Sequence, residues 1–160
     1  MLEKLFPGAA HLQNIHPLVV HFPIAFLSGA ALFYFLAAIV KSERIMWAAL
    51  WMLILGALGA IASVCTGLYG GEGVMIAPSV RDALLEHHEH LMIAMTALAG
   101  ILAIWAVAAR PMPGRVRWGF LLGLAAVCWL MAQGADLGGR MVYDYNAGGD
   151  ACSQPIDFSK

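Results

Sequence analysis

The stretch LVVHFPIAFLSGAALFYFLAAIV, residues 18–40, decides the fold. It contains no Asp, Glu, Lys or Arg, and it is longer than the about 20 residues that a helix needs to cross about 30 Å of hydrocarbon. Three further runs are equally free of these charges, at residues 45–71, 91–109 and 118–135. We therefore predict an all-α integral membrane protein, an up-and-down bundle of four transmembrane helices at about 17–40, 45–69, 88–109 and 116–137.

The composition supports one membrane domain over residues 1–160. Of the 160 residues, 61% are hydrophobic and only 12% are charged, which is too apolar for a soluble domain of this size. The first apolar run is too long for a signal peptide. We expect segment 1–15 to lie at the membrane surface and residues 138–160 to form an extracytoplasmic tail. The formal net charge of −1 gives no reason to expect a nucleic acid partner.

The basic residues predict the orientation of the bundle. Lys41 and Arg44 lie between the first two helices, and Arg110, Arg115 and Arg117 lie between the last two. Short basic loops stay in the cytoplasm, so both termini are predicted on the periplasmic side of a bacterial inner membrane. Membrane lipid is therefore an expected partner.

The six histidines collect at one end of such a bundle. His11 precedes the first helix, His16 and His21 open it, and His87, His88 and His90 open the third. In an up-and-down bundle these two helix ends lie on the same side of the membrane. Ionisable side chains inside membranes usually mark a functional site.

Paired imidazoles on two helices are typical of a b-type haem held by two axial histidines. We predict His21 and His88 as the iron ligands, with His16 and Arg140 as partners of the haem propionates. A second haem, held by His16 with His87 or His90, is an alternative. The same imidazoles also suit a bare Zn, Cu or Fe ion, with Glu86 or Glu89 as an oxygen ligand.

The three cysteines form no C-x-x-C-H motif, so covalently attached haem is not expected. Cys65 and Cys152 fall on the same predicted side of the membrane, where a disulfide between them is an open alternative. Cys128 falls within the fourth helix.

Four segments carry a resemblance to a family of bacterial membrane proteins, domain of unknown function 2231. They are HPLVVHFP at 16–23, TGLYGGEG at 66–73, HHEH at 87–90 and LGGRMVY at 137–143. The resemblance implies a four-helix membrane domain in a redox setting, since some members are associated with Rieske or cytochrome c modules. The histidine pattern of the family falls on His16, His21 and His88, whereas the tail after Tyr143 departs from the family.

These observations predict a membrane cytochrome rather than a stand-alone enzyme. It would carry electrons between a periplasmic carrier or larger redox complex and the membrane, with quinone as a candidate partner. The competing hypotheses are a non-redox accessory subunit of a larger complex and a membrane protein that binds a transition metal through its histidines.

Overall fold

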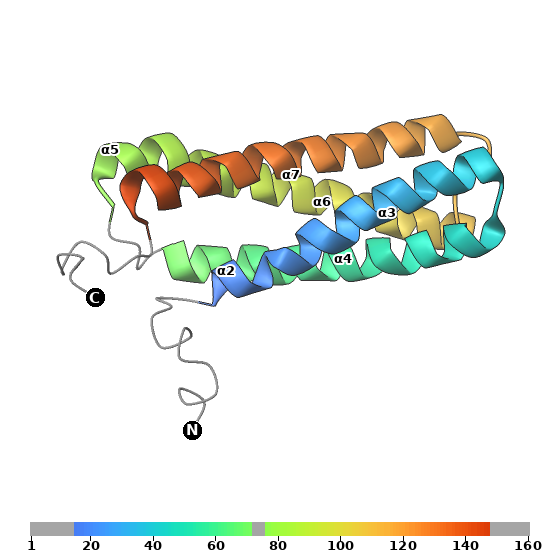
Figure 1. Cartoon of the computed structure of the whole chain (residues 1–160), viewed down its shortest axis with the longest axis horizontal. Helices are drawn as coiled ribbons and strands as arrows, with labels where there is room; N and C mark the ends of the chain where they lie inside the picture. The colour runs from blue at the N-terminus through green and yellow to red at the C-terminus, as the bar shows by residue number, and fades with distance from the viewer. Residues whose placement is uncertain (1–14, 72–75, 148–160) are drawn as a thin grey trace, which may run out of the picture.

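The four predicted membrane spans are present in a computed structural model, which describes residues 15–71 and 76–147 (Figure 1). The first span, His16–Val40, consists of α2 (His16–Val19) and α3 (His21–Val40). The second is α4 (Glu43–Gly71). The third, Pro78–Ala109, joins α5 (Pro78–Val80), the π-helical turn η2 (Arg81–Leu85) and α6 (Glu86–Ala109). The fourth is α7 (Arg117–Tyr145). The predicted all-α membrane fold is therefore confirmed.

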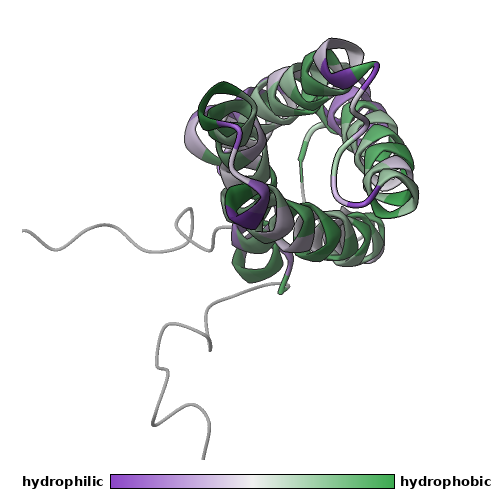
Figure 2. Cartoon of the chain, turned by 90° about the vertical axis from the view of Figure 1, so that its right-hand side faces the viewer, coloured by the Kyte–Doolittle hydropathy of each residue, from purple (hydrophilic) through white to green (hydrophobic). Residues whose placement is uncertain are grey.

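The helices form a closed ring. α3 packs on α4, α4 on α6, α6 on α7, and α7 on α3. Figure 2 looks along the bundle and shows the four helices around one centre, with hydrophilic residues gathered where the chain turns between helices. We call the end with residues 110–117 the arginine end, and the opposite end, where α2 and α6 begin, the histidine end.

Each long helix buries one stripe of residues in alternating steps of three and four. This heptad spacing is the one that keeps a single seam facing the neighbours in an antiparallel bundle. The stripes are Pro23, Leu27, Ala30, Tyr34 and Ala37 in α3; Ala49, Leu53, Gly56, Ala60 and Ser63 in α4; Met95, Ala99, Leu102 and Ala106 in α6; and Phe120, Leu124, Val127, Met131 and Gly134 in α7.

The arginine end is closed by an aromatic cluster. The hydroxyl of Tyr34, a fully buried residue, donates a hydrogen bond of 2.9 Å to the carbonyl oxygen of Pro111 in the loop between α6 and α7. The ring of Phe120 packs edge-on against Tyr34, with 4.9 Å between the ring centroids. The loop is thereby tied to the core at a point where bulky side chains fill the bundle.

The histidine end extends further than the sequence predicts. The third span begins at Pro78 rather than near residue 88, because proline suits the first helical position, where its missing N–H costs nothing. α7 continues to Tyr145 rather than ending near 137, so the predicted tail at 138–160 begins later. Both extensions are held by a small second core in which Leu84, Leu85 and Met141 are buried. Residues 1–14 and 148–160, which include most of the predicted surface segment and the rest of the tail, lie outside the described residues.

Candidate functional site: a histidine pair at one end of the bundle

His88 is held in one tautomer by the backbone of the neighbouring helix. Its Nδ1 lies 2.8 Å from the carbonyl oxygen of Gly134 in α7. Because a carbonyl oxygen only accepts, Nδ1 carries the proton and donates it. In the neutral imidazole Nε2 then keeps its lone pair, which is the arrangement that a metal-ligating histidine adopts. The described residues give His88 Nε2 no hydrogen-bond partner.

His16 is fixed in a similar way at the start of α2. Its Nδ1 lies 3.2 Å from the hydroxyl oxygen of Thr66 in α4. That hydroxyl donates its own hydrogen to the backbone carbonyls of Ala62 and Ser63, at 3.0 and 3.1 Å. The oxygen of Thr66 is therefore the acceptor, and His16 Nδ1 is the donor.

His16 and His88 are near one another inside the bundle. Both side chains are half-buried, and each imidazole lies within electrostatic range of the other. Both also continue the buried stripes: His16 stands seven residues before Pro23, and His88 stands seven before Met95. The heptad spacing thus turns one histidine from each helix toward the interior at the histidine end, where His16 lies against α4 and His88 lies against α7.

A glycine lies against each of the two imidazoles. A β-carbon on Gly67 would come within 2.9 Å of His16 Cε1, and one on Gly138 would come within 3.5 Å of His88 Cε1. Gly67 and Gly138 fall on the buried stripes of α4 and α7, four residues beyond Ser63 and Gly134. Small residues at these positions leave room for the two rings.

The structure places the other three candidate histidines elsewhere. His21, His87 and His90 are all exposed. His21 follows His16 by five residues, which corresponds to about 140° around a helix, so it faces away from the stripe that contains His16 and Pro23. The predicted pairing of His21 with His88 is not the one that the fold brings together; His16 is the histidine that faces His88. Neither His87 nor His90 accompanies His16 into the interior.

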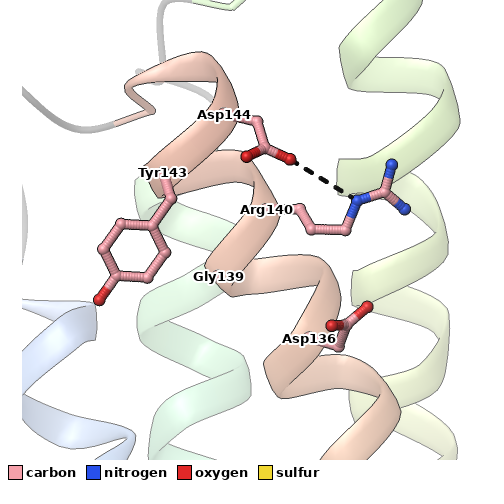
Figure 3. Close-up of a pocket in the computed structure, with 5 residues that line it drawn as sticks. All are labelled: Asp136, Gly139, Arg140, Tyr143 and Asp144. Carbon is pink, nitrogen blue, oxygen red and sulfur yellow. Dashed lines mark ion pairs between the residues drawn. The ribbon is translucent and has the colours of Figure 1, made fainter.

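Arg140 also lies away from the pair. Its guanidinium is on the exposed surface of α7, where Nε is 3.9 Å from Asp144 Oδ2 (Figure 3). About half of each side chain is exposed. The fold therefore does not support Arg140 as a partner of a haem bound between His16 and His88.

Two hydroxyl groups without partners lie further inside the same half of the bundle. Ser63 Oγ and Thr96 Oγ1 are buried, and neither has a hydrogen-bond partner among the described residues. Ser63 stands one helical turn inward of Gly67, and Thr96 stands two turns inward of His88. Neither Thr66 nor Thr96 was predicted from the sequence. Thr96 could have been found from its spacing, because it stands seven residues after Glu89 and so lies on the same face of α6. The carboxylate of Glu89 lies against Gly71 of α4, which shows that this face is turned toward α4.

The remaining candidate ligands do not gather around the pair. In residues 15–71 and 76–147, no group of three or more His, Cys, Asp or Glu could hold a metal ion. Glu86 is exposed, as is Cys65, while Cys128 is partly buried in α7. The suggested disulfide partner Cys152 lies outside the described residues.

Comparison with known protein families identifies the family of the chain. The family model described as "Predicted membrane protein (DUF2231)" matches residues 12–151, which include all four spans and both interior histidines. The chain belongs to this family. No curated protein and no solved structure matches it. Membership of DUF2231 agrees with the four apolar helices and establishes a membrane protein.

Proposed function

We propose that this protein is a membrane b-type cytochrome that holds one haem between His16 and His88. It would transfer electrons between a redox carrier, or a larger redox complex, at the histidine end and the membrane, including its quinone pool. The observation that carries the proposal is the tautomer of His88. The Gly134 carbonyl accepts a hydrogen bond from Nδ1, which leaves the Nε2 lone pair of this half-buried ring available as a ligand, within electrostatic range of a second imidazole that is fixed from another helix.

The donor set fits haem better than it fits a bare ion. A haem iron takes four nitrogens from its porphyrin, so two imidazoles complete its ligands. A structural zinc ion takes four protein ligands, and the described residues supply no third acid, cysteine or histidine at the pair. Gly67 and Gly138 allow the two imidazoles to lie close to the backbone of α4 and α7, and the hydroxyls of Ser63 and Thr96, which have no partner among the described residues, lie further inward.

Bound haem supplies reversible one-electron chemistry. The residues of this chain would set its potential and its position. His16 and His88 orient their ring nitrogens through Thr66 and Gly134, and hydrogen bonds of this kind raise the basicity of a ligand nitrogen. The apolar core between the histidine end and Tyr34 keeps the site on one side of the membrane.

We further propose that the histidine end faces the periplasm. The two loops at the arginine end carry Lys41, Arg44, Arg110, Arg115 and Arg117. Short loops rich in basic residues usually stay in the cytoplasm. A reporter enzyme that is active only in the periplasm, fused to the C-terminus, should be active. Activity of a cytoplasmic reporter at the same place would reverse the orientation.

A reduced-minus-oxidised visible spectrum of protein purified from cells with ample haem tests the central proposal. We expect a b-type band that is lost in His16→Ala and His88→Ala and kept in the exposed controls His21→Ala and His87→Ala. In His88→Gly, free imidazole should restore part of the band, which a simple folding defect would not allow.

Two outcomes contradict the proposal. If the wild-type protein has no band although haem is plentiful, the cytochrome assignment fails, and elemental analysis then tests the bare-metal hypothesis. If the band survives loss of His16 and His88 but not of His21, the ligand pair is wrong. A protein with neither haem nor metal would support the accessory-subunit hypothesis.

A further inference from the structure

The exposed face of α7 carries a hollow at the histidine end that is unrelated to the histidine pair. Asp136, Gly139, Arg140, Tyr143 and Asp144 line it, and its volume is about 280 Å³. Figure 3 shows Arg140, Asp144 and Asp136 on one side of the helix, Tyr143 on the other, and Gly139 between them. Because glycine has no side chain, the floor of the hollow is the helix itself.

The charges in the hollow are mixed. Asp136 and Asp144 stand four residues on either side of Arg140, so two carboxylates flank one guanidinium. The distance of 3.9 Å between Arg140 Nε and Asp144 Oδ2 is longer than a hydrogen bond. The N–H groups of Arg140 are thus not used by this contact, and its guanidinium can donate two parallel hydrogen bonds to a phosphate.

The hollow lies at the depth of lipid headgroups. Asp136 follows Arg117, the first residue of α7, by nineteen residues, which at 1.5 Å per residue is about 28 Å. The hydrocarbon core is about 30 Å thick, so a helix that enters at Arg117 leaves it near Asp136. Tyr143 is 88% exposed just beyond, where interfacial tyrosines are common.

Apolar side chains continue the same face toward the arginine end. Trp129 and Leu122 stand seven and fourteen residues before Asp136, and they are 66% and 71% exposed. A molecule with its polar group in the hollow would therefore have an apolar track beneath it. A membrane lipid has both parts in this order.

We propose that this hollow binds the headgroup of a zwitterionic aminophospholipid, phosphatidylethanolamine. The phosphate accepts hydrogen bonds from Arg140, and the primary ammonium donates to the carboxylates of Asp136 and Asp144. An anionic lipid without an amine, such as phosphatidylglycerol, brings its charge between two carboxylates. Phosphatidylcholine has no N–H to donate, so it leaves these carboxylates without a hydrogen-bond partner.

Native mass spectrometry of the full chain, released from nanodiscs that contain equal parts of the three lipids, tests the proposal. We expect phosphatidylethanolamine to be retained preferentially, and Arg140→Gln or Asp136→Asn to weaken its retention about tenfold, the effect of about 1.4 kcal/mol. Arg115→Gln, an exposed arginine at the opposite end, is the matched control and should retain it fully. Circular dichroism and gel filtration check that each variant is folded.

Equal retention of the three lipids would overturn the proposal, as would preference for phosphatidylglycerol or an unchanged Arg140→Gln variant. Purification of the native protein with another protein bound across α7, and no lipid there, would also overturn it. The haem proposal is not affected by any of these results, because His16 and His88 take no part in the hollow.

Discussion

The imidazole of His16 lies directly against the backbone of Gly67, so close that a β-carbon there would come within 2.9 Å of His16 Cε1. The contact joins the first turn of α2 to the last turns of α4. It explains why a glycine interrupts the apolar stripe of α4 at this level, since any other residue would push the ring out of the interior.

Gly67→Ala should therefore disturb the histidine pair. The added methyl group forces either His16 or α4 to move, and overpacking of this kind costs about 1–3 kcal/mol. We expect a lower thermal unfolding midpoint and, if haem is bound, a weaker b-type band. Differential scanning fluorimetry in detergent and the visible spectrum measure the two effects.

Gly119→Ala is the matched control for this prediction. A β-carbon at Gly119 would meet nothing within 4 Å, so it adds no clash. Alanine favours a helix over glycine by about 1 kcal/mol, and this variant should be as stable as the wild type or slightly more stable. If both variants behave alike, the close contact at Gly67 does not position His16.

The Thr66 hydroxyl should affect haem retention and the reduction potential without changing the fold around the site. Thr66→Val removes the oxygen that accepts the hydrogen bond from His16 Nδ1, and a lost hydrogen bond of this type costs about 1 kcal/mol, or roughly fivefold in haem retention. We expect faster haem loss to a haem-scavenging protein and a shifted reduction potential. Thr66→Ser keeps the hydroxyl and should restore both; failure of serine to do so would show that the methyl group is what counts.

Much of the fold follows from the sequence alone because it depends on apolar runs. The runs at 18–40 and 45–71 are close to the observed helices, since hydrocarbon thickness sets their length. The helix ends at the histidine end of the bundle were predicted less accurately. The charges of Arg81, Asp82 and Glu86 interrupt the apolar pattern after Pro78, and the helical start there is stabilised by the tertiary contact of Leu84 and Leu85 with Met141.

The site was predicted in part. The histidines do gather at one end, but the choice of His21 over His16 rested on its depth in the apolar run. The heptad from His16 through Pro23 and Ala30 to Ala37 is visible in the sequence and indicates the face that the fold buries. The hydrogen bonds from His16 to Thr66 and from His88 to Gly134 could not be predicted, because they depend on the register between helices that are far apart in the chain.

At the arginine end, Tyr34→Phe should destabilise the protein without touching the site. The substitution leaves the Pro111 carbonyl without the 2.9 Å hydrogen bond from a fully buried hydroxyl, at a cost of about 1–3 kcal/mol. Equilibrium unfolding in mixed micelles measures the loss. Tyr69→Phe, at a residue that is 86% exposed, should change the free energy of unfolding little. An equal effect at both positions would show that the bond to Pro111 adds no stability.

The same threonine-to-valine substitution should have opposite effects at Thr96, whose hydroxyl has no hydrogen-bond partner among the described residues, and at Thr66, whose hydroxyl is hydrogen-bonded. Thr96 Oγ1 is buried without a partner among the described residues, and such a hydroxyl costs about 1–3 kcal/mol. Thr96→Val keeps the shape and removes that cost, so apo-protein carrying it should unfold at a higher temperature than the wild type. Thr66→Val, which removes bonded groups, should unfold at a lower temperature. If Thr96→Val is instead destabilising in apo-protein, Thr96 has a partner such as an internal water molecule, and the interior beneath the histidines is wet.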